Sequence, residues 1–146
     1  MDRRLEILKR LPILFKDIPG ILRVTRNNVA VEEKGRPEII INDGDETASD
    51  QNQKQSVRRS PNVITMTPEI MVYSTGDHET ASADLHRIRS EIIKRVYTDT
   101  TISELTGPNG DVYYGGCEVR YAAGRRLEGE MMITISFSYP LIPAAL

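Results

Sequence analysis

The feature that most constrains this chain is a strict alternation of side-chain type over residues 130–141 (EMMITISFSYPL). One set of alternate positions is apolar: Met131, Ile133, Ile135, Phe137 and Tyr139. The set between them is largely polar: Met132, Thr134, Ser136 and Ser138. Successive side chains of a strand point to opposite faces of its sheet. The segment therefore predicts a half-buried strand, in a domain that builds its core on one face of a sheet.

Four other segments have the composition of strands: residues 21–27, 37–43, 62–74 and 111–122. The consecutive isoleucines of 37–43 (PEIIIND) predict a central strand covered on both faces, because β-branched residues fit a pleated, buried surface. In 62–74 the apolar residues keep one parity across Pro68, which predicts a single long strand. Proline cannot donate a backbone hydrogen bond to a ladder, so Pro68 is expected at a sheet edge or at a bulge.

Helical spacing appears in two longer segments. Leu5, Leu8, Leu11 and Phe15 predict an amphipathic helix over residues 2–16. Pro12 is expected to kink this helix or break it into two shorter turns, because proline removes a backbone bond. Apolar residues at helical steps predict a second helix over residues 80–96. Residues 98–110 (TDTTISELTGPNG) are typical of a short helical turn that Gly107–Pro108 ends.

The order of these elements, α-β-β-β-α-(α)-β-β, predicts an α+β fold. We expect a mostly antiparallel sheet of four to five strands packed against two helices, in a single domain over residues 1–146. The composition agrees, because 39% apolar and 27% charged residues are close to globular averages. The polar stretch DGDETASDQNQKQSVRRSP joins the second and third predicted strands, and residues 44–60 are expected to form a flexible arm.

Candidate catalytic groups do not converge in the sequence pattern. Cys117 is the one cysteine, and it shares strand parity with Val119 and Tyr121, which predicts a small buried thiol rather than a nucleophile. His78 and His86 lie eight positions apart, which is not the ligand spacing of a zinc site, and neither has an obvious nucleophile to serve. We therefore expect no enzyme activity and no cofactor.

Two other patterns favour ordinary structure over ligand binding. Asp43, Asp45 and Glu46 could hold a hard cation, but acidic residues in a polar loop are more often solvated, so no metal is expected. The glycine-rich run GPNGDVYYGG leads from a turn into a strand, whereas phosphate loops lead from a strand into a helix. It predicts a turn followed by a strand bulge at Gly115–Gly116.

The charge balance gives no general attraction to polyanions. Net charge is −2 at pH 7, so neither nucleic acid nor an anionic membrane surface attracts the chain as a whole. The doublets Arg58–Arg59 and Arg125–Arg126 could still form a local basic patch. A small nucleic-acid-binding α+β domain is therefore the alternative from a different functional class. No apolar run approaches the roughly 20 residues of a membrane span, and the N-terminal pattern is unlike a signal peptide, so synthesis in the cytoplasm is expected.

Five segments together resemble a known family: RRLEILKRLP, IPGILRVTRN, NVITMTPEI, NGDVYYGGCEV and GRRLEGEMMITISFSY. In this order, over most of the chain, they are similar to small proteins of long-tailed phages and prophages. Within that group they most resemble the tail terminator, or tail completion, family. The resemblance implies the α/β fold of the lambda-type terminators and a structural role without catalysis or cofactor. Other head–tail joining and neck proteins of similar size are the alternative within this class.

For assembly, the resemblance implies a homo-oligomeric ring, with a hexamer expected, that caps the tail tube and stops its growth. The partners would be further copies of the chain, the tail tube protein and the head–tail connector or neck protein. Genome DNA would pass through the lumen without sequence-specific binding. The protein would be made in the bacterial host cytoplasm and reside in the virion, in the tail or neck, with no membrane association.

A polar arm can order when it docks on a partner, which makes it a candidate contact segment; a passive insertion is the alternative. The candidate docking and inter-subunit residues are the charged residues of the arm and of the GRRLEG turn: Asp43, Asp45, Glu46, Arg58, Arg59, Arg125, Arg126 and Glu128. Complementary charge is expected between ring neighbours, because a heterologous contact joins two different patches of each copy.

Overall fold

The structure is a computed structural model that describes residues 1–27, 37–48, 62–76, 78–108, 110–121 and 128–146. Its elements are α1 (Arg3–Phe15), β1 (Arg23–Arg26), β2 (Glu38–Ala48), β3 (Asn62–Thr75), α2 (His78–Thr98), α3 (Thr100–Thr106), β4 (Asp111–Tyr121), β5 (Glu128–Leu141) and the short 3-10 turn η3 (Pro143–Ala145). This order confirms the predicted α+β fold, with the short helical turn realised as α3. Within the described ranges, no helix has both the length and the apolar character needed to cross a lipid bilayer.

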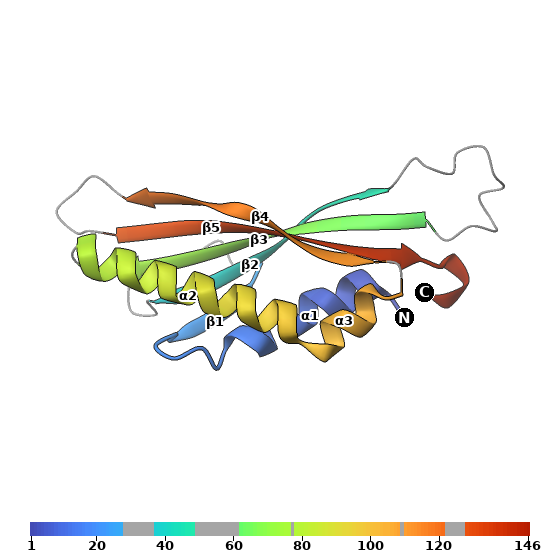
Figure 1. Cartoon of the computed structure of the whole chain (residues 1–146), viewed down its shortest axis with the longest axis horizontal. Coiled ribbons are helices and arrows are strands. Elements are labelled where there is room, and N and C mark those ends of the chain that lie inside the picture. The colour runs from blue at the N-terminus through green and yellow to red at the C-terminus, as the bar shows by residue number, and fades with distance from the viewer. Residues whose placement is uncertain (28–36, 49–61, 77, 109, 122–127) are drawn as a thin grey trace.

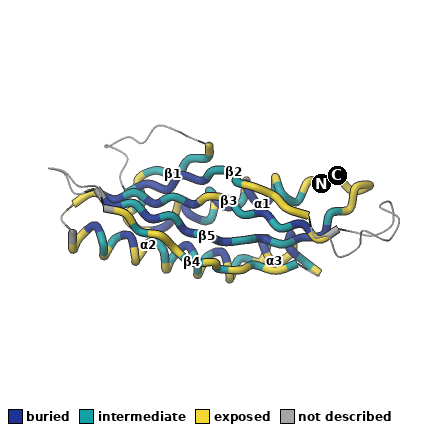
Figure 2. Tube along the Cα trace, turned by 90° about the horizontal axis from the view of Figure 1, so that it is seen from above, coloured by how far each residue is buried: buried dark blue, intermediate teal, exposed yellow. Residues whose placement is uncertain are grey.

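The strands form one five-stranded sheet in the order β1-β2-β3-β5-β4. β1 and β2 are parallel, and the other neighbouring pairs are antiparallel. The helices α1, α2 and α3 all lie on one face of the sheet (Figure 1). Seen from above, β1 and β4 are the outer strands, and the two chain termini lie close together near one end of the molecule (Figure 2). In its described part, the sheet thus has one helix-covered face, one face without helices, called the open face below, and two edges.

The core lies between the helix-covered face and the helices. Met131, Ile133, Ile135 and Phe137 of β5 are fully buried, which confirms the alternation seen in the sequence. The helices bury most of the side chains that their spacing predicted: Leu8, Leu11, Phe15, Leu85, Ile88 and Ile92. Each such side chain stabilises the fold by roughly 1.5–3 kcal/mol relative to an exposed position. The isoleucines of β2 are buried on both faces, as expected for a central strand.

β2 contains a bulge opposite Pro68 of β3. The register of the β2–β3 ladder shifts between Asn42 and Asp45. Gly44 takes a left-handed φ of +68° there, and a side chain at this position would overlap the carbonyl oxygen of Thr67. The bulge accommodates proline inside a central strand, which is one of the two arrangements expected for Pro68.

The flexible arm was predicted to start at residue 44, which is too early, because β2 continues to Ala48. Residues 44–48 belong to β2, and the ladder with β3 continues to the pair Ala48–Ile64. The reason is the bulge, which absorbs the extra residues and restores pairing with β3. The polar residues after it therefore continue β2, with their side chains exposed. Residues 49–60 of the predicted arm lie outside the described residues.

Of the two outcomes predicted at Pro12, a kink or a break, the structure rules out the break. α1 is a single helix over Arg3–Phe15, so the expected break into two turns is wrong. The backbone N–H of Lys16 donates to the Pro12 carbonyl at 3.1 Å, so the turn after the proline is closed. Burial of Leu11 and Phe15 on the same helix face offsets the lost backbone bond.

Cys117 is exposed, so the prediction of a buried thiol is wrong. A bulge shifts the register between Tyr114 and Gly116, with a φ of +122° at Gly116, and this confirms the bulge expected at the glycine pair. Beyond it, Cys117 lies opposite the buried Ile133, so it does face the helical layer. β4 is an edge strand, however, where one of the two flanking strands that bury a central residue is missing. Facing the helical layer is therefore not sufficient for burial at this edge.

Candidate functional site

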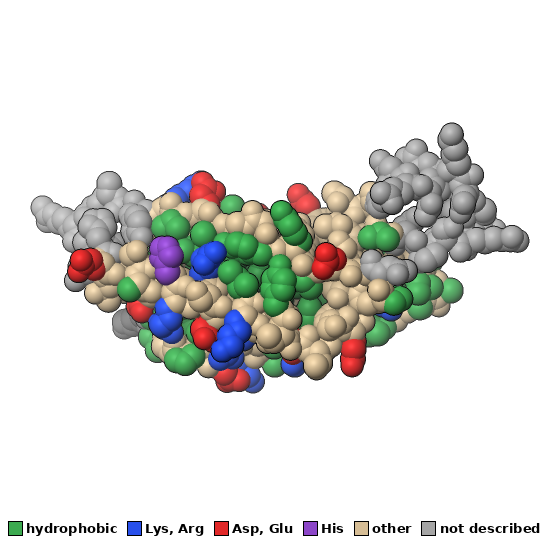
Figure 3. Space-filling model, in the orientation of Figure 1, with side chains coloured by type: hydrophobic (Ala, Val, Ile, Leu, Met, Phe, Trp, Pro, Cys, Tyr) green, Lys and Arg blue, Asp and Glu red, His purple; other side chains and the backbone are tan. Residues whose placement is uncertain are grey.

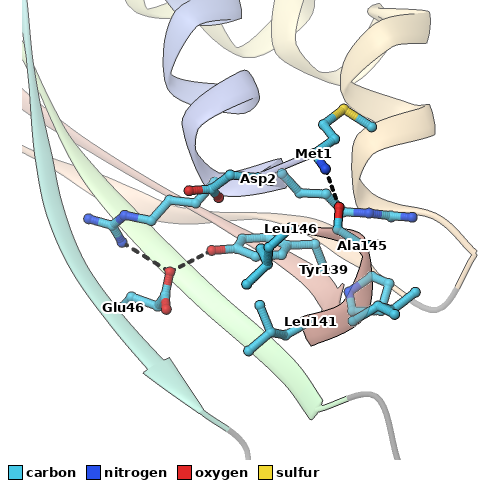
Figure 4. A pocket seen from close by; sticks show the side chains of 11 residues that line it. Met1, Asp2, Glu46, Tyr139, Leu141, Ala145 and Leu146 are labelled. Atoms are coloured by element: carbon cyan, nitrogen blue, oxygen red, sulfur yellow. Dashed lines mark hydrogen bonds and ion pairs between the residues drawn. The ribbon is translucent and has the colours of Figure 1, made fainter.

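The acidic candidates of β2 have different surroundings, and Glu46 contacts both α1 and β5. The Tyr139 hydroxyl donates to Glu46 Oε2 at 2.7 Å, and Arg4 Nη1 lies 3.4 Å from the same oxygen (Figure 4). Arg4 Nη2 also donates to the carbonyl oxygen of Gly44 at 2.9 Å. One guanidinium group from α1 thus holds both the bulge and the carboxylate that follows it.

The Tyr139 hydroxyl acts as a hydrogen-bond donor at this site. Burial, together with the hydrogen bond to Glu46, raises the pKa of the Tyr139 phenol far above its ordinary value. A phenol with a raised pKa keeps its proton at neutral pH, so it cannot serve as a general base there. Its role is to tie β5 to β2 beside the start of α1.

A pocket of about 380 Å³ opens next to this network. Charged side chains from the start of α1 and from β2 line one side, and apolar residues after Tyr139 line the other. Its carboxylates already have partners in the chain: Asp2 accepts the backbone N–H of Leu5 as the cap of α1, and Glu46 is bonded to Tyr139. No cysteine, serine or histidine is among the described lining residues. The pocket thus combines an apolar wall with charged groups that are already bonded within the chain.

Asp43 forms a paired ion contact with Arg26 of β1. Arg26 Nε donates to Asp43 Oδ1 at 2.8 Å, and Nη2 donates to Oδ2 at 3.0 Å. The Asn27 side-chain oxygen accepts the backbone N–H of Asp43 at 3.1 Å. The hydrogen bonds from Arg26 hold the pKa of the Asp43 carboxyl below its usual value. Asp43 thus ties the end of β1 to the middle of β2.

The remaining candidates do not form one cluster with these residues. Asp45 is exposed on β2, opposite Thr67 of β3. Glu128 begins β5 and pairs with Thr75, while its side chain is not described. The predicted contact residues Arg58, Arg59, Arg125 and Arg126 lie outside the described residues. Three acidic candidates therefore lie along β2 and the fourth, Glu128, begins β5, so they do not converge on a single site.

Several arginines that sequence reasoning missed hold the helical layer together. Arg10 makes hydrogen bonds of 2.8 and 3.1 Å to Asp99, whose carboxylate also caps α3. Arg3 donates to two carbonyl oxygens at the end of α3, and Arg95 of α2 donates to a carbonyl oxygen near the end of α1. Only Asp99 had a sequence signal, because an aspartate directly before a helix is a common cap. The arginine roles depend on which helices become neighbours, which no local pattern encodes.

The open face of the sheet carries a row of hydroxyl groups. Thr65 Oγ1 and Ser138 Oγ lie 3.0 Å apart, and Thr67 Oγ1 and Ser136 Oγ lie 2.8 Å apart. Both pairs join β3 to β5 on the face opposite the core. These groups are uncharged and partly exposed, so this part of the face can contact another protein without desolvating a buried charge.

In the part of the chain that the structure describes, no three His, Cys, Asp or Glu side chains come together to hold a metal ion. His86 is exposed, and its Nδ1 lies 2.8 Å from the Ser82 carbonyl oxygen within α2. The side chain of His78 is not described. No protein-family model matches the chain, and no curated protein matches it significantly.

Proposed function

We propose that this chain is a structural protein of a phage tail or neck, which forms a ring that caps the tail tube. The observation that carries the proposal is the order of elements: helix, three strands, two helices and two strands in one α+β domain. This order is similar to the one that the resemblance to the tail terminator family implies. The function that follows is to stop tube polymerisation and to provide the surface for head attachment.

The surfaces support a role in assembly. The open face presents cross-strand hydroxyl pairs such as Thr67–Ser136, and the pocket beside Glu46 has its carboxylates bonded within the chain. Protein interfaces depend on area and shape complementarity, with a modest number of hydrogen bonds, rather than on convergent titratable groups. An α+β domain with an open sheet face and two edges offers surfaces of that kind.

Three described arginines give no support to the nucleic-acid-binding alternative, whose doublets Arg58–Arg59 and Arg125–Arg126 lie outside the described residues. Arg3, Arg10 and Arg95 direct their guanidinium groups to carbonyl or carboxylate oxygens of the chain itself. Binding to phosphates depends on cations that are free to replace the counterions of the nucleic acid. The genome is therefore proposed to pass through the lumen of the ring without sequence-specific contact.

The proposed mechanism is steric and needs no cofactor. One face of the ring matches the last ring of tube subunits, and the other face does not, so a further tube subunit finds no complementary surface. The connector or neck protein then binds that second face. The protein would be made in the host cytoplasm and remain in the virion.

Asp45 is the described residue that best fits a docking role. It is exposed on β2 beyond the bulge, whereas Asp43 and Glu46 are held by partners within the chain. Residues 49–60 follow this end of β2, and their role in docking stays part of the proposal. Docking through exposed charge changes association with a partner more than it changes folding.

Tail length tests the proposed function. Phage particles produced without this chain are expected to contain tails of uncontrolled length that are not joined to heads, as seen by electron microscopy. Supplying the wild-type chain should restore tails of normal length. Asp45→Lys should restore them poorly although it folds normally by circular dichroism, whereas the control Glu104→Lys, at an exposed position of α3, should restore them fully. Normal tails joined to heads in the absence of the chain would contradict the proposal.

A further inference from the structure

The edge strand β4 has the properties of a strand that takes a further neighbour. It is 11 residues long and, among the described strands, pairs only with β5. Natural edge strands are commonly protected by proline, lysine, a bulge or short length; β4 contains neither proline nor lysine, and its bulge is confined to Gly115–Gly116. One outward N–H has an internal acceptor, since Tyr114 donates to the Tyr97 hydroxyl at 2.7 Å. The remainder of this long edge is suited to a partner strand.

An apolar surface runs beside this edge. On the helical side, Tyr97 of α2 is 50% exposed and Cys117 is exposed; on the open face, Tyr113, opposite Ser136, is 66% exposed. Hydrophobic side chains gather between the sheet and α2 in the space-filling view (Figure 3). Arg89 of α2 borders this surface: its Nε donates to the Tyr114 hydroxyl at 2.8 Å, and its guanidinium carbon lies 5.1 Å from the centre of that ring. A partner strand on β4 would cover exposed apolar area as well as backbone groups.

The opposite edge of the sheet has complementary features. Leu22, directly before β1, is 66% exposed. Two charged groups near these edges are paired within the chain, because Arg26 of β1 contacts Asp43 and Glu118 of β4 contacts Arg120. The exposed apolar residue at this edge thus matches the exposed apolar side chains beside β4 at the other edge.

Strand directions determine how two copies can combine. β1 is parallel to β2, and antiparallel steps lead from β2 to β3, from β3 to β5 and from β5 to β4. β4 therefore runs antiparallel to β1. A second copy placed beside the first in the same orientation brings its β1 antiparallel to β4, which is the more stable kind of ladder.

We propose that β4 of one copy pairs with β1 of the next copy, so that the sheet continues from subunit to subunit. This contact is heterologous, because it joins two different surfaces of the same chain, and successive copies can close into a ring. The inference deepens the proposed function and rests on it for ring closure. Two-fold pairing of β4 with a second β4 is the competing arrangement, and it would end at a dimer.

The single cysteine makes this contact testable. Cys117 lies exposed on β4, so the wild-type chain supplies one thiol at the proposed interface. The double variant Leu22→Cys/Cys117→Ser supplies one thiol beside β1. The two proteins are mixed under mild oxidation and separated on a non-reducing gel. A disulfide requires Cα atoms within about 7 Å, so a mixed dimer reports direct contact between the two edges.

A matched control uses Thr25→Cys/Cys117→Ser. Thr25 also lies on β1, in register with Ile40 of β2. The neighbours of Ile40 in sequence, Ile39 and Ile41, face the core, so the side chains of Ile40 and Thr25 point to the open face. Cys117 faces the helical layer, opposite Ile133. The proposed pairing predicts a mixed dimer with the Leu22→Cys protein at several times the yield obtained with the Thr25→Cys protein. It also predicts that the combined chain, Leu22→Cys with Cys117 retained, forms a ladder of linked multimers.

Two results would overturn the proposed pairing. A wild-type dimer linked through Cys117 in preference to the mixed dimer would show two-fold pairing of β4, and absence of the mixed dimer would show that the two edges do not meet. The native mass of the same samples separates this inference from the proposed function. A ring without the mixed dimer rejects this contact and leaves the function standing, whereas a mixed dimer in a protein that does not control tail length rejects the function alone.

Discussion

The two faces of the sheet use the same strands in different ways. On the helix-covered face, Ile133 and Phe137 of β5 have no exposed surface. On the open face, Ser136 and Ser138 of the same strand are partly exposed and lie within hydrogen-bond distance of hydroxyls of β3. The covered face therefore supplies most of the hydrophobic stabilisation, whereas Ser136 and Ser138 on the open face stay accessible for contact. Stability and assembly should respond separately to substitutions on the two faces.

The largest expected effect comes from a cavity on the covered face. Ile133→Ala should lower the free energy of unfolding by about 2–5 kcal/mol, because it removes buried methyl groups and leaves a void. Its neighbour in sequence, Thr134→Ala, lies on the other face and should change that free energy by less than about 1 kcal/mol. Urea denaturation at pH 7 measures both. Similar losses for the two variants would contradict the division between faces.

A smaller effect is expected in the helical layer, at Asp99. Asp99→Ala should cost about 1–2 kcal/mol of unfolding free energy, because α3 loses its cap and Arg10 loses its partner. The hydrogen bonds from Arg10 lower the pKa of Asp99 in the folded state. Its stabilisation is thus fully present above the unfolded-state pKa of about 3.9, and it is lost as the pH falls through the folded-state value.

Asp99→Asn separates the cap from the charge. Asparagine keeps an oxygen that can cap α3, so this variant should be more stable than Asp99→Ala at pH 7 and should lose less stability on acidification than the wild type. Urea titrations repeated between neutral and acidic pH provide the comparison. An unchanged acid dependence in Asp99→Asn would show that another carboxylate is responsible.

Removing the hydroxyl group of the buried Tyr139 should lower the free energy of unfolding by less. Tyr139→Phe keeps the ring on the covered face and removes the hydroxyl that donates to Glu46. The expected loss is about 1 kcal/mol, because Glu46 retains its contact with Arg4. Tyr113→Phe, at a position 66% exposed, is the control and should leave the thermal midpoint almost unchanged. Equal shifts for the two variants would mean that the Glu46 contact does not stabilise the fold.

The smallest change in unfolding free energy is predicted for Cys117, which compares the exposed edge strand β4 with the buried core. Cys117→Ser should change the unfolding free energy by no more than about 0.5 kcal/mol, because the side chain is exposed. A bulky thiol reagent should label the native protein rapidly. Slow labelling that requires unfolding would show that Cys117 is covered after all.

The strands and helices were predictable because their patterns are local. The alternation in β5 and the spacing of α2 each identify one buried face without knowledge of the neighbours. Three details required tertiary context: α1 continues through Pro12 because its apolar face is buried, β2 extends to Ala48 because a bulge restores pairing, and Cys117 is exposed because β4 is an edge. In each case, packing or strand order decided the outcome.

The candidate site was less predictable than the fold. The charge of Asp43 and Glu46 identified them as candidates, but their partners Arg26 and Arg4 come from distant parts of the sequence. A pattern of charges does not show which ion pairs will form within the chain and which groups will stay free. Among the described acidic candidates, Asp45 is the one left exposed on β2 without such a contact.

The mass of the assembled protein tests the central claim most directly. Native mass spectrometry of the concentrated wild-type chain, supported by light scattering after size-exclusion chromatography, measures how many 16.5 kDa copies associate. A heterologous contact between β4 and β1 predicts a closed ring whose mass is a small multiple of the chain, with a hexamer expected. A species that stops at a two-fold symmetric dimer at all concentrations would contradict the account, because its isologous contact closes on itself.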